Sequence, residues 1–367
     1  MSRDRLGFGR RRQADVYLAG VRGRKPRVPA NPRALEERAR KTMSAQGFAY
    51  VAGGAGLETT MAANRAAFER RQIVPRACRD VSVRRMGVEL FARTLPGPFL
   101  TAPVGVLELA HHDADVAVAR AAAAEGVPMI FSNQASKPME ACAAAMGDAP
   151  RWFQLYWSTP NELVLSFVSR AEACGCEAIV LTLDTTMLGW RLRDLDLAYL
   201  PFLFGKGIAQ YVSDPVFQGL LDEAEPAPSE RGPVSVAALK ALVQLARAYP
   251  GSSWENLRSE RPRGGRQVDG AIATLDALPG IVEAVGRRVP VLLDSGVRGG
   301  ADAFKAPALG ARAVLIGRPY VHGLAAGGES GVREVLRNFF ADFDLTMGLA
   351  GCAAVDEIGP EALDQPA

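Results

Sequence analysis

Short apolar segments alternate with amphipathic helical segments from about residue 98 onward. Each apolar segment is closed by Gly, Asn, Asp or Pro, a pattern typical of the buried strands of a parallel sheet. Six strands are expected, at residues 98–106, 128–133, 151–157, 178–184, 289–297 and 313–319. Helices are expected at residues 113–126, 161–175, 274–286 and 299–311. This alternation predicts a parallel sheet with right-handed crossovers.

The predicted elements make six βα units, whereas a common closed (β/α) barrel has eight. Residues 185–288 contain no convincing strand. Before the helix expected at 274–286, they hold an acidic, Pro-rich linker and one expected helix at 235–249. We therefore expect an α/β fold of the (β/α)8 TIM-barrel type, incomplete because strands 5 and 6 are missing. Helical segments should precede the barrel at 32–70 and close it at 330–365.

The same pattern suggests how the chain divides. Residues 1–45 are expected to form an N-terminal arm and helix, and residues 46–367 the barrel domain. An irregular insertion is expected within that domain at about 192–263. Basic residues cluster near the start of the chain, which favours a solvated arm over a polyanion site.

Composition excludes several classes of function. The chain has 367 residues, is 48% hydrophobic and carries a formal charge of +3, which is too mild to indicate a nucleic-acid partner. No run approaches 18 apolar residues, so no membrane span is expected. The five cysteines lack metal-ligand spacing, so we expect no metal site. Their odd number and the absence of a signal peptide favour the cytoplasm.

The turns after the last two expected strands are candidates for a phosphate site. They read Asp-Ser-Gly-Val-Arg at 294–298 and Gly-Arg at 317–318. In barrels these loops commonly bind phosphate through backbone N–H groups and a helix N-terminus. Arg298 and Arg318 would add charge-assisted hydrogen bonds. The alternative is that the glycines only close tight turns.

Other polar residues fall at the carboxyl ends of expected strands. They are Ser132, Gln154 with Tyr156, and Thr182, which is followed by Arg191. A serine or threonine in such a place is often only a helix cap. Together with a phosphate site, however, this set of polar strand ends favours a phosphorylated cofactor.

Several segments resemble the FMN-dependent 2-hydroxy-acid oxidase and dehydrogenase family, which includes glycolate oxidase, lactate oxidase and lactate 2-monooxygenase. The matching segments are FAYVAGGAGLETTMAANRAAF, PVGV, FSNQAS, WFQLYW, LTLDTTMLGWRLRD, LLDSGVRGGADAFKAPALGA and IGRPYVHGLAAGGESGV. They span residues of about 45–215 and 264–355. YVAGGAG and LGWRLRDLD are most similar to the lactate 2-monooxygenase branch.

The resemblance implies an FMN-dependent oxidoreductase that transfers a hydride from a small, lactate-like 2-hydroxy acid to the flavin. The product would be the 2-keto acid or its decarboxylated product, and a homo-oligomer of four or more subunits is implied. The implied FMN contacts are Pro103, Val104, Gly105, Ser132, Gln154 and Thr182, with Asp294, Ser295, Gly296, Val297, Arg298, Gly317 and Arg318 at the phosphate. The implied substrate contacts are Tyr50, Tyr156, Arg191 and Arg266.

The sequence departs from the family at the proton acceptor. In the family, Ser-Asn-His directly precedes the Gly-Gly-Arg-Gln turn, and a lysine lies on strand 5. Here Arg263 precedes Gly264, and only six residues separate Leu257 from that glycine. A β-α-β unit of about 30 residues is missing. Because a guanidinium does not deprotonate usefully, Arg263 cannot replace the histidine.

No residue of the chain can therefore be assigned as the catalytic base from the sequence. The histidines are His111, His112 and His322; the first two follow the first strand, and the third lies in the closing helix. We expect surface or capping roles for them. An alternative function follows from this gap: a catalytically impaired pseudoenzyme that retains flavin or phosphate binding, or serves as a structural partner.

Overall fold

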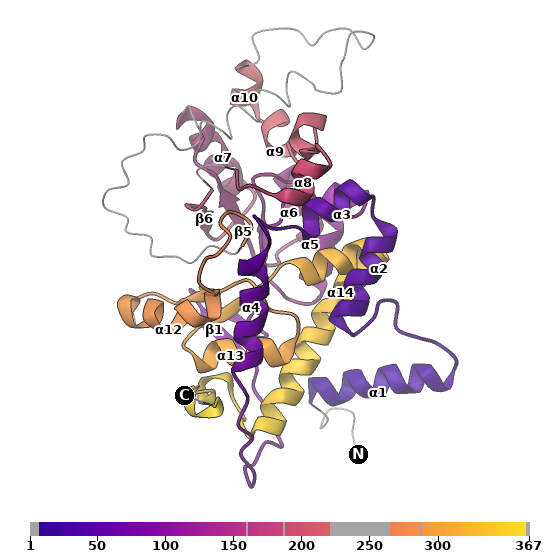
Figure 1. Cartoon of the computed structure of the whole chain (residues 1–367), viewed down its shortest axis with the longest axis vertical. Coiled ribbons are helices and arrows are strands. Elements are labelled where there is room, and N and C mark those ends of the chain that lie inside the picture. The colour runs from indigo at the N-terminus through magenta and orange to yellow at the C-terminus, as the bar shows by residue number, and fades with distance from the viewer. Residues whose placement is uncertain (1–6, 159–160, 186–187, 221–264, 287, 365–367) are drawn as a thin grey trace.

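The computed structural model describes residues 7–158, 161–185, 188–220, 265–286 and 288–364 (Figure 1). The expected helix at 235–249, Arg263 and Gly264 lie outside these residues, as does most of the expected insertion. None of the helices that the structure describes is long and apolar enough to cross a membrane.

Six parallel strands form one curled sheet, and each lies within a segment expected from the sequence. Their order across the sheet is β6-β5-β4-β3-β8-β7. The strands are β3 (Phe99–Thr101), β4 (Met129–Phe131), β5 (Arg151–Leu155), β6 (Ile179–Leu181), β7 (Leu292–Leu293) and β8 (Ala313–Ile316). The prediction of an incomplete barrel is confirmed: β6 and β7 are the two edges, and no described strand lies between them.

Helices cover the outer face of this sheet and bury its centre. They are α5 (Ala114–Ala124), α6 (Met139–Met146), α7 (Asn161–Ala173), α12 (Thr274–Val285) and α13 (Gly300–Ala308). The central strands β3 and β4 are buried at every residue, as parallel strands between two layers should be. At the edge, by contrast, Ile179 of β6 is 40% exposed.

The long helix α14 (Arg318–Ala350) closes the core and crosses the lower half of Figure 1. Phe339, Phe340 and Phe343 surround Phe99 with ring-centre distances of 4.9–5.9 Å. The backbone of Gly327 and Gly328 is non-helical, so α14 consists of two helical segments. The second begins close to the expected start at 330 but ends at Ala350, before the expected end at 365. Pro319 lies in the first turn of the first segment, where the missing N–H costs no hydrogen bond.

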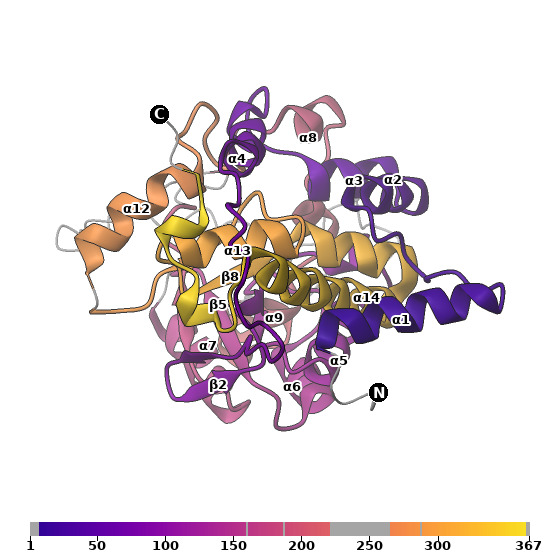
Figure 2. The same ribbon diagram turned by 90° about the horizontal axis from the view of Figure 1, so that it is seen from below.

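The N-terminal segment differs from the expected solvated arm. Helix α1 (Phe8–Val21) lies along α14 in Figure 2. The N–H of Gly9 donates to Asp344 at 2.8 Å, and the ring of Phe8 lies 5.7 Å from that of Phe340. This packing was not expected, because the basic residues of α1 indicated a solvated segment. Three further helices follow: α2 (Pro32–Thr42), α3 (Ala45–Ala52) and α4 (Thr59–Arg70).

The remaining elements are short. A hairpin of β1 (Val88–Leu90) and β2 (Arg93–Leu95) precedes the sheet. The other helical elements are η2 (Leu107–Leu109), α8 (Leu192–Asp196), η3 (Pro201–Phe204), α9 (Ala209–Val212), α10 (Pro215–Gly219), η5 (Val355–Glu357) and η6 (Pro360–Ala362).

Residues 197–207 are apolar enough to cover an open sheet edge, but the structure places them elsewhere. The N–H of Gly207 donates to Glu108 at 3.0 Å, and that of Ala209 donates to the carbonyl of Ala135 at 3.1 Å. The segment therefore packs on the loops that follow β3 and β4.

Candidate active site

A cavity of about 350 Å³ opens at the carboxyl ends of the strands, where the chemistry of α/β barrels is located. Every site residue expected from the sequence lines it except Ser132. These residues are Tyr50, Pro103, Val104, Gly105, Gln154, Tyr156, Thr182, Arg191, Arg266, Asp294, Ser295, Gly296, Val297, Arg298, Gly317 and Arg318. Segments from both halves of the chain thus meet in one space.

The turn at residues 294–298 forms one end of this cavity. Gly296 has φ +83°, and a Cβ there would lie 2.7 Å from the carbonyl oxygen of Asn64. Only glycine fits this position without displacing α4. Ser295 also has a positive φ, of 70°. The turn is therefore a fixed cradle rather than a variable loop.

Two half-buried arginines, Arg298 and Arg318, give this part of the cavity its charge. Burial lowers the pKa of Arg298, and burial followed by the nearby charges of Arg298 and Arg266 lowers the pKa of Arg318 to about 9. A lowered pKa means that these cations lack sufficient compensating negative charge. A phosphate dianion would supply it, so the residues present fit the phosphate of FMN.

The polar strand ends form a hydrogen-bonded chain in the cavity wall. Gln154 donates from Nε2 to Thr182 Oγ1 at 2.8 Å, and its Oε1 accepts from the N–H of Asn133 at 3.1 Å. Ser132 Oγ lies 3.4 Å from the same Oε1 and accepts from the N–H of Gln134 at 3.1 Å. Ser132 is thus buried behind Gln154 and fixes the direction of its amide.

Arg266 is held by the carboxyl end of α3. Its Nη1 donates to the carbonyls of Tyr50 at 2.8 Å and Gly53 at 3.2 Å. Because the last carbonyls of a helix have no intrahelical partner, a guanidinium is well suited to bind them. The neighbouring N–H of Ala55 donates to the carbonyl of Gly265 at 2.9 Å. The Gly-Arg-Gln part of the turn is therefore fixed by α3.

Arg191 lies on the same side of the cavity. Its Nε donates to the carbonyl of Arg266 at 3.2 Å, and its Nη2 donates to Gln267 Oε1 at 3.1 Å. The guanidinium carbons of Arg191 and Arg266 lie 5.9 and 5.1 Å from the ring centre of Tyr50. The two cations and this phenol consequently form one cluster, which can bind a carboxylate.

Tyr156 completes the cluster from the loop after β5. Burial raises the pKa of its hydroxyl to about 12, and the nearby Tyr50 and Asp184 add to that effect. The hydroxyl therefore stays protonated at neutral pH and can donate a hydrogen bond to an oxygen of a substrate.

Ten lining residues were not expected from the sequence: Val51, Ala102, Gln134, Asp184, Thr185, Leu188, Phe202, Gln267, Leu315 and Val321. Asp184 could have been found, because it is the last residue of the expected strand at 178–184. Gln134 could have been found too, because it directly follows the expected strand at 128–133. Phe202 could not, since it comes from the irregular segment after α8 and nothing local indicates that it reaches the cavity.

None of the three histidines lines this cavity. His111 caps locally, accepting at Nδ1 from the N–H of Asp113 at 3.2 Å, and His112 is exposed. The expectation of a surface or capping role is wrong for His322, which is only 3% exposed and stacks on Phe48. Burial lowers its pKa to about 3, and nearby Arg298 and Arg318 contribute. Its helix packs on α2 and α3, which removes it from water.

An α/β barrel whose strand ends carry arginines that fit a phosphate defines a class, the barrel enzymes that bind a phosphorylated cofactor. The profile of the family described as FMN-dependent dehydrogenase matches residues 39–254 and 263–365. The chain therefore belongs to the FMN-dependent dehydrogenase family and is an FMN-dependent enzyme.

Curated relatives agree with this assignment. The FMN-dependent alpha-hydroxy acid dehydrogenase qulF of Penicillium citrinum is 38% identical, over 96% of this chain and 94% of the relative. An L-lactate oxidase of Lysinibacillus sphaericus is 37% identical, over 93% and 94%. Oxidation of 2-hydroxy acids is thus the activity of this group. Nothing in these comparisons supports the alternative of an impaired pseudoenzyme.

Solved structures show the same fold. A lactate oxidase of Pediococcus acidilactici aligns with a TM-score of 0.77 at 31% identity, covering 92% of this chain and 95% of that one. A mandelate oxidase with (S)-4-hydroxymandelic acid aligns with a TM-score of 0.77 at 33% identity, covering 92% and 98%.

The comparisons also locate the missing segment. The family match breaks between residues 254 and 263. The alignment with the Penicillium relative runs over 382 positions, more than the 367 residues of this chain. The relative consequently has residues for which this chain has no counterpart, in agreement with a lost β-α-β unit.

Proposed function

We propose that this chain oxidises a small, lactate-like 2-hydroxy acid at the cavity between α3 and the turn at 294–298. The observation that carries the proposal is that two pairs of arginines line one cavity. Arg298 and Arg318 belong to the turns after β7 and β8, and Arg191 and Arg266 lie beside Tyr50. Arg318 and Arg266 are neighbours, since both donate to carbonyls at the carboxyl end of α3. The first pair suits a phosphate and the second suits a carboxylate.

The cofactor would be held by the residues at the strand ends. Arg298, Arg318 and the backbone at 294–297 and Gly317 would bind the phosphate, while residues 103–105, Gln154 and Thr182 would orient the ring system. When bound, FMN supplies the acceptor for a hydride. Ser132 would act indirectly, by fixing the amide of Gln154.

The substrate would be held by four side chains. Arg191 and Arg266 would bind its carboxylate, and Tyr50 and Tyr156 would donate hydrogen bonds to its oxygens. Phe202, Leu188 and Val51 also line the cavity and would exclude water. A space of about 350 Å³ that must also hold the flavin favours a small acid. The product would be the 2-keto acid or its decarboxylated product.

The direct test is anaerobic reduction of the FMN-loaded protein. We expect a flavin spectrum near one FMN per chain, which bleaches when L-lactate or another small 2-hydroxy acid is added. L-2-hydroxy acids with bulky side chains should act more slowly. A fully loaded protein that no 2-hydroxy acid bleaches would contradict the proposal.

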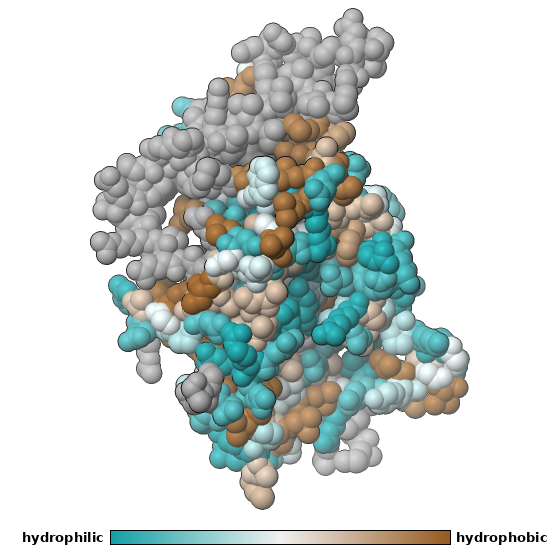
Figure 3. Space-filling model, viewed as in Figure 1, coloured by the Kyte–Doolittle hydropathy of each residue, from teal (hydrophilic) through white to brown (hydrophobic). Residues whose placement is uncertain are grey.

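We further propose a homo-oligomer of four or more subunits. Support comes from the outer end of α1, where the large side chains of Tyr17, Leu18 and Val21 are exposed. Figure 3 shows hydrophobic surface at that end of the helix. Light scattering at micromolar concentration checks this; a monomer would contradict it, and Leu18→Ser with Val21→Ser should weaken the assembly.

Two further proposals concern organisation and location. Residues 1–45 would be an N-terminal arm and helix packed against α14, and residues 46–367 the catalytic domain. A chain shortened to 46–367 should then still bind FMN. A cytoplasmic location is supported by the five cysteines, all of them free thiols in the structure. Cell fractionation tests that location.

A further inference from the structure

The cavity has few groups that can accept a proton. Oxidising a 2-hydroxy acid requires loss of the hydroxyl proton as well as the hydride. Among the described residues that line the cavity there is no histidine and no lysine, and the only carboxylates are Asp184 and Asp294. The guanidinium groups accept no proton, and Tyr156 stays protonated because its pKa is raised to about 12.

Asp294 belongs to the phosphate end. It is the first residue of the cradle that contains Gly296 and Arg298. Its Oδ1 accepts from Ser295 Oγ at 3.1 Å, and its carbonyl accepts from Thr274 Oγ1 at 2.9 Å. A proton acceptor here would stand beside the cofactor's phosphate rather than beside the substrate's hydroxyl.

Asp184 belongs to the substrate end. It lies three residues after the end of β6, and its Oδ1 accepts from Thr185 Oγ1 at 3.2 Å. Its charge is close enough to Tyr156 to raise the pKa of that hydroxyl, to which Thr185 is hydrogen-bonded. Arg191 also acts on Tyr156, so the carboxylate, the phenol and the substrate arginine share one region.

We propose that Asp184 accepts the hydroxyl proton of the substrate in this chain, directly or through one water molecule. The proposal rests on the oxidation of a 2-hydroxy acid proposed above. The O–H bond breaks and the proton joins the carboxylate of Asp184. The C2–H bond breaks with its electron pair, which leaves as hydride to the flavin that the family's activity supplies, and C2–O becomes a carbonyl.

This assignment changes the expected pH profile. An imidazole titrates near pH 6.5 and a carboxyl group near pH 4. With an imidazole acceptor, kcat/KM would fall about thirtyfold between pH 8 and pH 5. With a carboxylate acceptor it should change less than about threefold over that range. Asp184 accepts from Thr185 and acts on Tyr156, and Tyr50 and Arg191 act on the same phenol. Arg266 lies against the ring of Tyr50. Phenol and guanidinium groups do not change their charge between pH 5 and 8.

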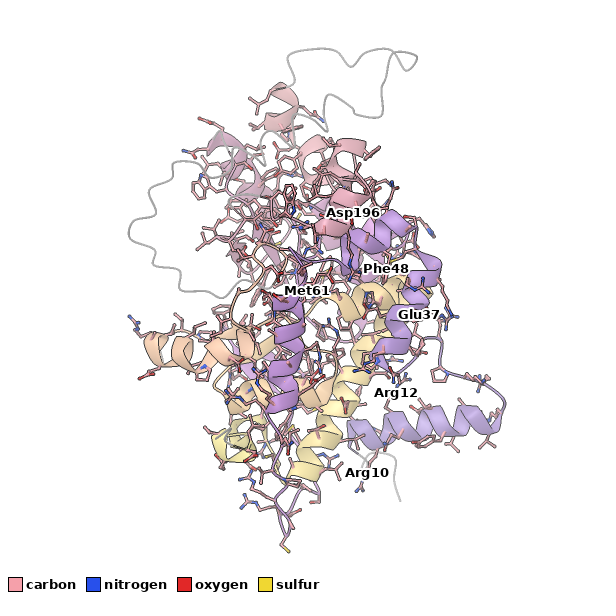
Figure 4. All side chains as sticks on the ribbon, in the orientation of Figure 1. Arg10, Arg12, Glu37, Phe48, Met61 and Asp196 are labelled. Carbon is pink, nitrogen blue, oxygen red and sulfur yellow. The ribbon has the colours of Figure 1, made fainter. Side chains whose placement is uncertain are left out.

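The variant test compares Asp184→Asn with Asp196→Asn in the FMN-loaded full chain. Asp196 is an exposed carboxylate on α8 that does not line the cavity, and it is labelled in Figure 4. We expect Asp184→Asn to lower kcat by at least about 100-fold with KM changed less than about threefold. Asp184→Glu should restore part of the rate. Asp196→Asn should match the parent chain.

A measurement without turnover separates chemistry from structure. The dissociation constant of pyruvate, measured by equilibrium dialysis, should be unchanged or lower in Asp184→Asn, because an amide does not repel a carboxylate. FMN content should stay the same. Weaker pyruvate binding together with the loss of rate would show a structural role instead and would overturn the assignment.

The remaining outcomes are also decisive. Asp184 is not the acceptor if Asp184→Asn keeps kcat within threefold of the parent chain. It is also not the acceptor if kcat/KM of the parent chain falls thirtyfold by pH 5. Either result would leave the proposed oxidation of a 2-hydroxy acid standing. The second measurement needs no variant, so it holds even if Asp184→Asn folds poorly. A loaded parent chain that no 2-hydroxy acid reduces would overturn the oxidation itself, and this assignment with it.

Discussion

Arg266 donates from Nη1 to the carbonyl of Tyr50 at 2.8 Å and lies 5.1 Å from the centre of the ring of the same residue. One side chain thereby binds both the backbone and the aromatic ring of a residue 216 positions earlier. The turn that follows the missing segment is consequently positioned by α3. This contact explains how the chain keeps Arg266, the arginine proposed to bind the substrate, in place next to the gap.

Replacing Arg266 by lysine should affect both stability and substrate binding. An ammonium cannot match the planar donor set that reaches the carbonyls of Tyr50 and Gly53. We expect the free energy of unfolding to fall by about 1–3 kcal/mol and KM for the 2-hydroxy acid to rise at least tenfold. Urea titration and steady-state kinetics measure these effects.

The matched control is Arg24→Lys, because Arg24 is exposed between α1 and α2. It should leave both quantities unchanged. An Arg266→Lys protein with the parent's KM would show that this residue does not contact the substrate, whatever its effect on stability.

Arg318 should make FMN binding depend on pH. Its pKa is lowered to about 9, chiefly by burial, and a bound phosphate would raise it again. As pH rises through 9 the free protein loses this charge, so FMN should bind about tenfold more weakly at pH 10 than at pH 8. Quenching of FMN fluorescence measures the dissociation constant.

The variant Arg318→Met should bind FMN at least about 100-fold more weakly and lose most of this pH dependence. If the parent chain binds FMN equally well at both pH values, Arg318 keeps its proton throughout and the argument from burial fails.

Buried His322 should destabilise the fold in mild acid. Its pKa is lowered from 6.5 to about 3, so the unfolded chain binds a proton there before the folded chain does. Stability from this residue is therefore complete above about pH 6.5 and is lost as pH falls from 6.5 towards 3. The loss should be roughly 1 kcal/mol per pH unit.

Thermal unfolding between pH 7 and pH 5 tests this with His322→Phe, which keeps a ring against Phe48. The variant should lose less stability on acidification than the parent, with kcat within threefold. His112→Phe, at an exposed position, should behave as the parent. An unchanged slope in His322→Phe would mean that other groups cause the acid lability.

The sequence predicted the fold because each strand is a local apolar signal. All six strands were found, and so was the gap, because the loss of a β-α-β unit removes two such signals at once. The turn proposed to bind phosphate was predictable for the same reason: Gly296 and Arg298 are two residues apart and lie within five residues of the end of β7.

Long-range contacts were not predictable in this way. Three contacts join segments that are far apart in the sequence, so no local pattern indicates them. They are the cap of Arg266 on α3, the packing of α1 on α14 and the position of Phe202 in the cavity wall. His322 shows the same limit: its helical segment is expected, but its burial depends on Phe48 from another helix.

The open sheet should exchange amide hydrogens unevenly. Strands β3 and β4 have a parallel neighbour on each side, whereas β6 pairs only with β5, and β7 only with β8, among the described strands. Edge strands open locally at a lower free energy than central ones. We expect peptides covering 179–181 and 292–293 to exchange at least tenfold faster than those covering 99–101 and 129–131.

Hydrogen exchange with mass spectrometry measures this at pH 7, with and without FMN. FMN should slow exchange near β7, because the turn at 294–298 follows that strand. At β6, most of the difference in exchange rate from the central strands should remain. Equal protection of β6 and β3 in the apoprotein would mean that another part of the chain or another subunit pairs with that edge.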